Sequence, residues 1–122
     1  MFIQFLFIFL GGGLGSISRY AVSYITPNYY KGNFPLGTFL VNIIGCFLIG
    51  LFSIVLHKNL TLNEFLITGF CGGFTTFSSF SKEAFLLFNK AKIKLAFIYV
   101  FSSCVVGLLS LFLGYITGGG NC

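Results

Sequence analysis

The stretch Gly69-Phe-Cys-Gly-Gly-Phe-Thr-Thr-Phe-Ser-Ser-Phe80 lies in the middle of a hydrophobic segment, where a membrane helix would be expected to continue unbroken. Glycine is a poor helix former, and threonine is stiff and can divert backbone hydrogen bonds through its hydroxyl. The stretch therefore predicts a helix that stops and restarts inside the bilayer, with the break at residues 72–75. Non-helical backbone at that depth is tolerated only where protein buries it or where it lines a polar cavity. Broken membrane helices often form ion or substrate sites, because their half-helix ends expose N–H and C=O groups.

The composition indicates a membrane protein around this break. The 122 residues are 57% hydrophobic and only 7% charged, whereas soluble domains carry about 25% charged residues. Since a spanning helix needs about 20 apolar residues, we expect an all-α membrane protein with one domain of four spans, at about residues 2–25, 35–56, 62–89 and 95–117. Four such helices enclose little interior, so a site is expected to be shared between subunits.

The charged residues argue against two other classes of protein. The net charge of +5 comes partly from Lys90, Lys92 and Lys94 in one short loop, which is typical of a membrane surface rather than a nucleic-acid interface. With two acids, one histidine and no nucleophile–base pair in view, the sequence does not favour an enzyme. Thr61 and Glu64 have the spacing of a capping box, which predicts that Thr61 begins the third span and that Glu64 is a cap rather than a catalytic acid.

Two polar residues inside the first two spans are candidates for a site. Arg19 is costly at that depth and has two readings: it draws anions into a vestibule, or it pins the helix. Asn42 shares a helical face with Thr38, and a buried amide needs partners. Either it donates an interhelical hydrogen bond or it donates to a passing anion, and the spacing leaves both open.

Further candidates follow the break and recur in the last span. Phe77 and Phe80 are three residues apart on one helical face, and Ser81 continues that face one turn after Phe77. The alternative for the two phenylalanines is ordinary core packing, in a chain with 18 Phe. In the last span, Tyr99 and Ser103 are four apart. Whether Glu83 and Thr38 belong to the same polar path stays open.

Three motifs together resemble one known family, the Fluc fluoride channels, also called CrcB. They are Gly12-Gly-Leu-Gly-Ser-Ile-Ser-Arg-Tyr20, Pro35-Leu-Gly-Thr-Phe-Leu-Val-Asn42 and the opening stretch, 69–80. The resemblance implies an antiparallel, dual-topology dimer with two narrow fluoride pores along the subunit interface. It also implies a central structural Na⁺ and passive export of fluoride across a multi-pass plasma-membrane channel, here expected to be bacterial.

The resemblance assigns roles to particular residues. The pore-lining set that it implies, completed by the hydroxyl of Ser81, is Asn42, Phe77, Phe80, Ser81, Tyr99 and Ser103. Arg19 matches the arginine of the family's first span. The backbone carbonyls of Gly72 and Thr75 match those that hold the sodium ion. The family often continues the last-span stripe with hydroxyls, whereas this chain has Gly107 and Leu111.

The lysines bear on orientation and on partners. Four spans put both termini and the loop at Lys58 on one side, while the other two loops carry Lys31, Lys90, Lys92 and Lys94. The positive-inside rule then places both termini outside. Because a chain that inserts both ways should have balanced loops, this bias predicts a preferred orientation. The partner is therefore either an identical chain or a paralogous one.

Two other functions are compatible with four short spans. A small antiparallel multidrug exporter needs a buried carboxylate, usually in its first span, where this chain has only Arg19. A non-conducting structural subunit of a heterodimeric complex would be expected to lose the pore residues, yet Asn42, Phe77 and Phe80 are present.

Overall fold

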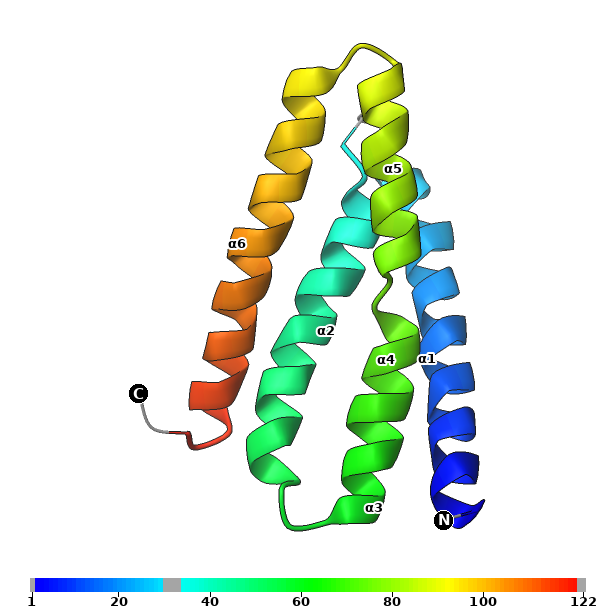
Figure 1. Cartoon of the computed structure of the whole chain (residues 1–122), viewed down its shortest axis with the longest axis vertical. Helices are drawn as coiled ribbons and strands as arrows, with labels where there is room; N and C mark the ends of the chain where they lie inside the picture. The colour runs from blue at the N-terminus through cyan, green and yellow to red at the C-terminus, as the bar shows by residue number, and fades with distance from the viewer. Residues whose placement is uncertain (1, 30–33, 121–122) are drawn as a thin grey trace.

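The chain forms four long helical rods that lie side by side. The computed structural model describes residues 2–29 and 34–120, and Figure 1 shows their arrangement. The elements are α1 (Phe2–Tyr29), α2 (Leu36–Val55), α3 (Leu60–Asn63), the π-helix η1 (Glu64–Cys71), α4 (Gly72–Phe74), α5 (Phe77–Asn89) and α6 (Ile93–Thr117). No β-strand occurs among these residues. Because α3, η1 and α4 follow one another without interruption, residues 60–89 make a single rod with one break.

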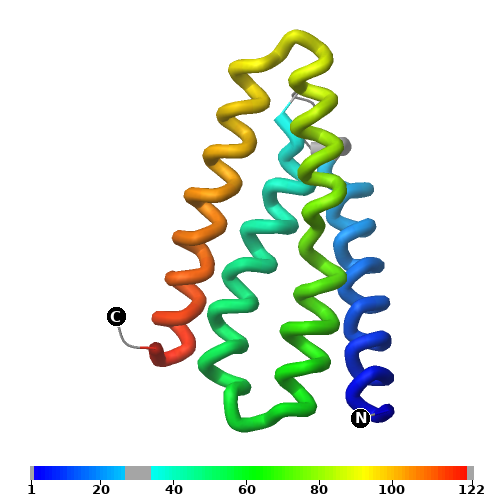
Figure 2. Tube along the Cα trace, in the orientation of Figure 1, coloured from blue at the N-terminus to red at the C-terminus, as the bar shows by residue number. Residues whose placement is uncertain are grey.

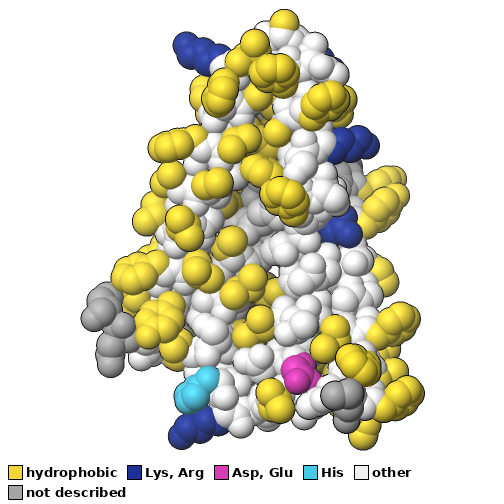
Figure 3. Space-filling model, viewed as in Figure 1, with side chains coloured by type: hydrophobic (Ala, Val, Ile, Leu, Met, Phe, Trp, Pro, Cys, Tyr) yellow, Lys and Arg dark blue, Asp and Glu magenta, His cyan; other side chains and the backbone are white. Residues whose placement is uncertain are grey.

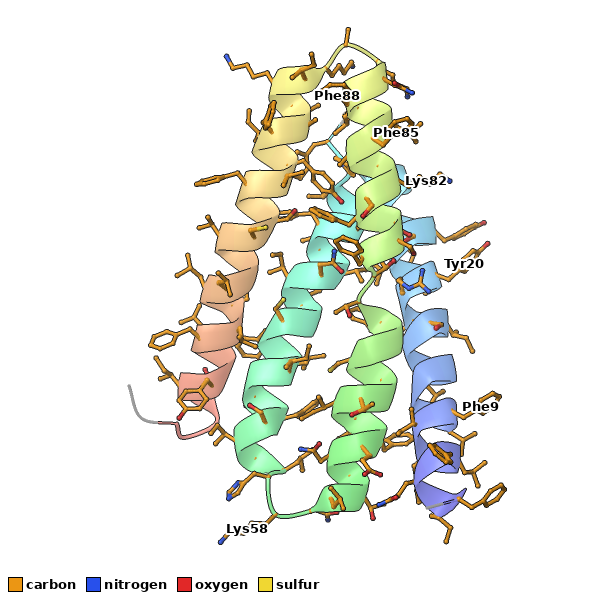
Figure 4. All side chains as sticks on the ribbon, in the orientation of Figure 1. Phe9, Tyr20, Lys58, Lys82, Phe85 and Phe88 are labelled. Carbon is orange, nitrogen blue, oxygen red and sulfur yellow. The ribbon has the colours of Figure 1, made fainter. Side chains whose placement is uncertain are left out.

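Three of the rods are long and apolar enough to cross a membrane, at Phe2–Thr26, Leu36–Val55 and Ile93–Thr117. Phe9, Tyr20, Phe85 and Phe88 are more than half exposed, and Phe9 and Tyr20 project outward from α1 (Figure 4). Hydrophobic side chains project along both flanks of the bundle (Figure 3). Contact with lipid makes such exposed aromatic residues favourable. The structure thus confirms an all-α, multi-pass membrane protein in which the third of four helices is broken.

The break lies slightly later than the sequence predicts. Residues 72–75 were expected to be non-helical, but Gly72–Phe74 is helical, and the extended residues are Thr75 (φ −77°, ψ 157°) and Thr76 (φ −148°, ψ 121°). The threonine hydroxyls explain this position. Thr75 Oγ1 donates to the carbonyl of Cys71 (2.9 Å), and Thr76 Oγ1 accepts from the backbone N–H of Ser79 (3.1 Å) as the N-cap of α5. One hydroxyl thus closes the first half-helix and the other opens the second. The Cα trace in Figure 2 shows the interruption between the two half-helices.

Glycines let the rods approach at backbone distance, as expected for the first span. A side chain at Gly15 of α1 would overlap the carbonyl oxygen of Phe70, and one at Gly73 would overlap that of Gly12. On the other side, a side chain at Gly50 of α2 would overlap the carbonyl oxygen of Leu111 in α6. Small residues drive helix association in membranes in this way. The packing around Gly73 also explains why two consecutive glycines remain helical.

The predicted N-cap of the third span is wrong. The N-cap before α3 is Asn59, whose Oδ1 accepts from the N–H of Leu62 (3.1 Å), and not Thr61, which is already helical. Asn59 directly precedes the first helical residue, Leu60, and its side chain is therefore placed to accept from the N–H of Leu62. The span predicted at about residues 2–25 lies in α1, which runs to Tyr29 and whose membrane-spanning candidate is Phe2–Thr26. Pro27 has no backbone N–H, so one helical hydrogen bond cannot form there. The helix nevertheless continues through this position to Tyr29. The second and fourth helices differ from the predicted bounds by one or two residues.

Both ends of the described chain lie at the same end of the bundle as the α2–α3 turn (Figure 1). The α5–α6 turn lies at the opposite end. Lys58 is therefore on the end that carries the termini, and the lysines of 90–94 are on the other. This is the arrangement that four spans require.

Candidate functional site

Asn42 of α2 bridges the break in the third rod. Its Nδ2 donates to the carbonyl of Thr76 (3.2 Å), and its Oδ1 accepts from the N–H of the same residue (2.9 Å). The interhelical reading of Asn42 is therefore observed. A side-chain amide carries two N–H groups, so the second N–H of Nδ2 is available for another acceptor.

The same contact changes the hydrogen bonding of Gly72. In a continuous helix the N–H of Thr76 would donate to the Gly72 carbonyl, but it donates to Asn42 instead. Gly72 is exposed, although it lies midway along a membrane rod. Thr75 has extended backbone, so its carbonyl also leaves the helical direction. The break thus presents two backbone oxygens to their surroundings.

Arg19 of α1 binds the end of the first half-helix. Its Nε donates to the carbonyl of Gly73 (3.1 Å) across 54 residues of sequence. A cation at a helix C-terminus is stabilised by the helix dipole, and the buried carbonyl gains a charge-assisted partner. This is the contact that the pinning reading of Arg19 requires, and the anion-attracting reading stays a prediction.

A groove of about 350 Å³ opens beside the break, between α2, α5 and α6. It is mainly apolar, with amide and hydroxyl groups at intervals. Its lining is Asn42, Cys46, Ile49, Thr75, Thr76, Phe77, Phe80, Ser103 and Cys104. Phe77 is 79% exposed, and its ring centroid lies 6.0 Å from that of Phe80. Four residues of the predicted pore set, from three helices, therefore meet in one groove.

Tyr99 lies directly behind this groove. Its side chain is fully buried, and its ring centroid is 5.1 Å from that of Phe80. The hydroxyls of Tyr99 and Ser103 are buried without a hydrogen-bond partner among the described residues. Leaving a buried polar group unpaired is costly, so both hydroxyls are suited to a ligand that accepts hydrogen bonds.

Two predicted pore residues, Ser81 and Tyr99, do not line the groove, and some lining residues were missed. Ser81 is exposed and does not line the cavity. Cys46 lies four residues after Asn42, so helical spacing was a signal for it. Ile49, seven residues after Asn42, continues the same helical face, whereas Cys104 carried no such signal. Thr38, whose role was open, is buried and donates its hydroxyl hydrogen bond to the carboxylate of Glu83.

No group of three or more His, Cys, Asp or Glu side chains is placed to hold a metal ion in residues 2–29 and 34–120. Hard cations, however, take oxygen ligands, including backbone carbonyls.

Comparisons with known proteins bear on this arrangement. Residues 6–115 match the family model described as "CrcB-like protein, Camphor Resistance (CrcB)". The chain is 45% identical over 114 residues to the fluoride-specific ion channel FluC of Flavobacterium psychrophilum, covering 90% of this chain and 92% of the relative. It is 40% identical over 121 residues to the protein of that name from a Hydrogenobaculum species, covering 96% and 98%. The match to the FluC of Pyrococcus abyssi is 43% over 115 residues, covering 91% and 92%. On these matches and its broken third helix, the chain belongs to the CrcB family.

Proposed function

We propose that this chain is a fluoride-selective passive channel of the cell membrane, which lets fluoride leave the cytoplasm. The observation that carries the proposal is the groove at the broken helix. It joins Asn42, Phe77, Phe80 and Ser103 on one path, in a family whose relatives are named fluoride-specific ion channels.

The chemistry of the groove suits a small, strongly hydrated anion. Fluoride must exchange its water for hydrogen-bond donors and for the positive edges of aromatic rings. The free N–H of Asn42 and the unpaired hydroxyls of Ser103 and Tyr99 are such donors. Because no lysine or arginine lines the groove, binding stays weak enough for rapid exit. Ser81, outside the groove, would donate at the end of the path.

The functional unit is proposed to be an antiparallel dimer with two such pores. Exposed Phe77 and exposed Gly72 are then covered by a second subunit, which closes the open side of the groove. A sodium ion at the centre would be held by the Gly72 and Thr75 carbonyls of both subunits and would be structural. Its positive charge, with that of Arg19, raises the potential midway through the membrane and attracts anions.

The subunits are identical, or one is a paralogous chain. The lysine bias toward one end of the bundle favours a preferred orientation for this chain. The multidrug-exporter alternative has no support in the groove, since no carboxylate is among its lining residues.

The test is fluoride efflux from liposomes that contain only this purified chain, followed with a fluoride electrode. Rapid efflux of fluoride but not of chloride is expected. Phe80→Ile should abolish it, because the ring that lines the groove and touches Tyr99 is lost. Phe88→Ile is the matched control, since Phe88 lies on the same helix α5, is 54% exposed and does not line the groove.

Three other outcomes are informative. Equal loss of efflux in both variants would contradict a pore role for Phe80. Equal fluxes of fluoride and chloride would contradict selectivity. If well-folded protein carries no fluoride, co-reconstitution with a paralogous chain tests the heterodimer; a mixture that is also silent would overturn the channel function.

A further inference from the structure

Phe34 lies just before α2, outside the groove, yet it contacts the residue that supports the groove from behind. Its ring is perpendicular to that of Tyr99, at a centroid distance of 5.4 Å and an interplanar angle of 88°. Tyr99 in turn lies 5.1 Å from Phe80, a lining residue. Phe34 is therefore one ring away from the groove wall.

The backbone holds Phe34 firmly in this place. The N–H of Leu36 donates to the carbonyl of Phe34 (2.7 Å), and Pro35 has φ −74° and ψ 75°. These are the values of an inverse γ-turn. The ring of proline already restricts φ to this region, so little entropy is lost in forming the turn. The turn joins Phe34 rigidly to the first residue of α2.

A second ring fixes the orientation of Phe34. Phe39, one turn into α2, packs against it edge to face, with centroids 5.3 Å apart and an angle of 71°. Phe34, Phe39 and Phe80 all pack on the buried cluster that contains Tyr99. Edge-to-face aromatic pairs are stabilising and directional, so Phe34 restricts the ring of Tyr99.

We propose that Phe34 is a positioning residue of the anion path, which sets the ring of Tyr99 and, through it, the ring of Phe80. The inference rests on the proposed fluoride channel function. Phe34 itself touches neither the groove nor the anion. Its role is to keep the Tyr99 hydroxyl and the Phe80 edge at the distances that replace the water of fluoride.

The first test is fluoride efflux with Phe34→Leu, which keeps an apolar side chain but removes the ring edge. The rate should fall about three- to tenfold, the range expected from loss of one directional aromatic contact. Phe34→Tyr keeps the ring and should restore nearly the full rate. Phe7→Leu is the control: Phe7 forms a similar perpendicular pair with Phe65 (6.2 Å, 88°) between α1 and η1, away from Tyr99.

A mutant cycle separates positioning from general destabilisation. If Phe34 acts through Tyr99, Phe34→Leu should cause no further loss of efflux in a Tyr99→Leu background. Independent, multiplying losses would overturn the proposal, as would a Phe34→Leu rate equal to that of Phe7→Leu.

A second cycle does not depend on conduction. The melting temperatures of the Phe34→Leu and Tyr99→Leu proteins and of their double variant, in detergent, should show coupling of the two rings. Absence of coupling would contradict the proposal even in a conducting protein. If the wild-type chain and its paralogue-paired form carry no fluoride, the channel function fails, while this cycle still decides whether Phe34 positions Tyr99.

Discussion

Arg19 shows how one side chain can be tolerated inside a membrane rod. A charged group is costly at that depth unless it finds a partner, and the Gly73 carbonyl is available because the helix stops two residues later. The break therefore creates the acceptor that makes the arginine tolerable. In return, the guanidinium stabilises the negative end of the first half-helix.

Arg19→Met should therefore lower the free energy of unfolding by about 1.5–3 kcal/mol, the range for a hydrogen bond to a charged group. Thermal unfolding in detergent, followed by circular dichroism, measures the loss. Lys82→Met is the matched control, because it removes one charge from an exposed site on α5. If Arg19→Met melts like the control but slows fluoride entry at low salt, the arginine attracts anions and does not pin the break.

At the scale of elements, the broken rod keeps its shape because neighbouring helices hold it on two sides. α1 packs against η1 and α4 through glycines. α2 supplies the side-chain amide of Asn42, which forms hydrogen bonds with both the backbone N–H and the backbone C=O of Thr76. An isolated segment with this sequence would leave those groups unpaired in lipid, at a cost of several kcal/mol each.

Two glycines of α1 allow a matched test of this packing. Gly15→Ala places a methyl group into the Phe70 carbonyl, whereas Gly13→Ala meets nothing within 4 Å. We expect Gly15→Ala to destabilise the protein by about 1–3 kcal/mol through overpacking. Gly13→Ala should be neutral or more stable by up to about 1 kcal/mol, because alanine is the better helix former. Melting curves of the two variants that coincide would show that α1 does not need this close approach.

At the scale of the whole molecule, the bundle leaves residues of the proposed pore and ion site exposed. Phe77 at the groove and Gly72 at the break are both exposed. In a membrane, either lipid or a second subunit must cover them. A polar break is poorly solvated by lipid, which favours a subunit. The sodium ion proposed there would then link the two copies.

Removal of sodium should consequently weaken assembly as well as transport. An ion that binds only the dimer stabilises it by about 2.7 kcal/mol when present at a hundred times its Kd. Protein purified and reconstituted in N-methylglucamine salts should lose fluoride efflux and shift from dimer to monomer on size exclusion. Restoring Na⁺ should reverse both effects, and a sodium-free dimer with full efflux would exclude the structural ion.

The segments that the sequence predicted well are those with a strong local signal. Apolar runs of about 20 residues predict spans from length alone, and Gly72 to Thr76 predict a break because such residues disfavour or divert helical hydrogen bonds. The position at which the break begins was not predicted correctly. The Gly72–Phe74 turn stays helical only because α1 packs against it, and that contact joins residues far apart in the chain.

Sequence by itself therefore determined the class of the protein, the number of its rods and the rod that is interrupted, because lipid requires long apolar helices and these residues interrupt one. Tertiary structure alone decided which groups share the site. It paired Asn42 with Thr76, Arg19 with Gly73 and Phe34 with Tyr99. It also left Ser81 and Tyr99 outside the lining of the groove. Such contacts depend on the rotation and depth of each helix relative to its neighbours, which the close packing of glycine backbones sets and which no single span encodes.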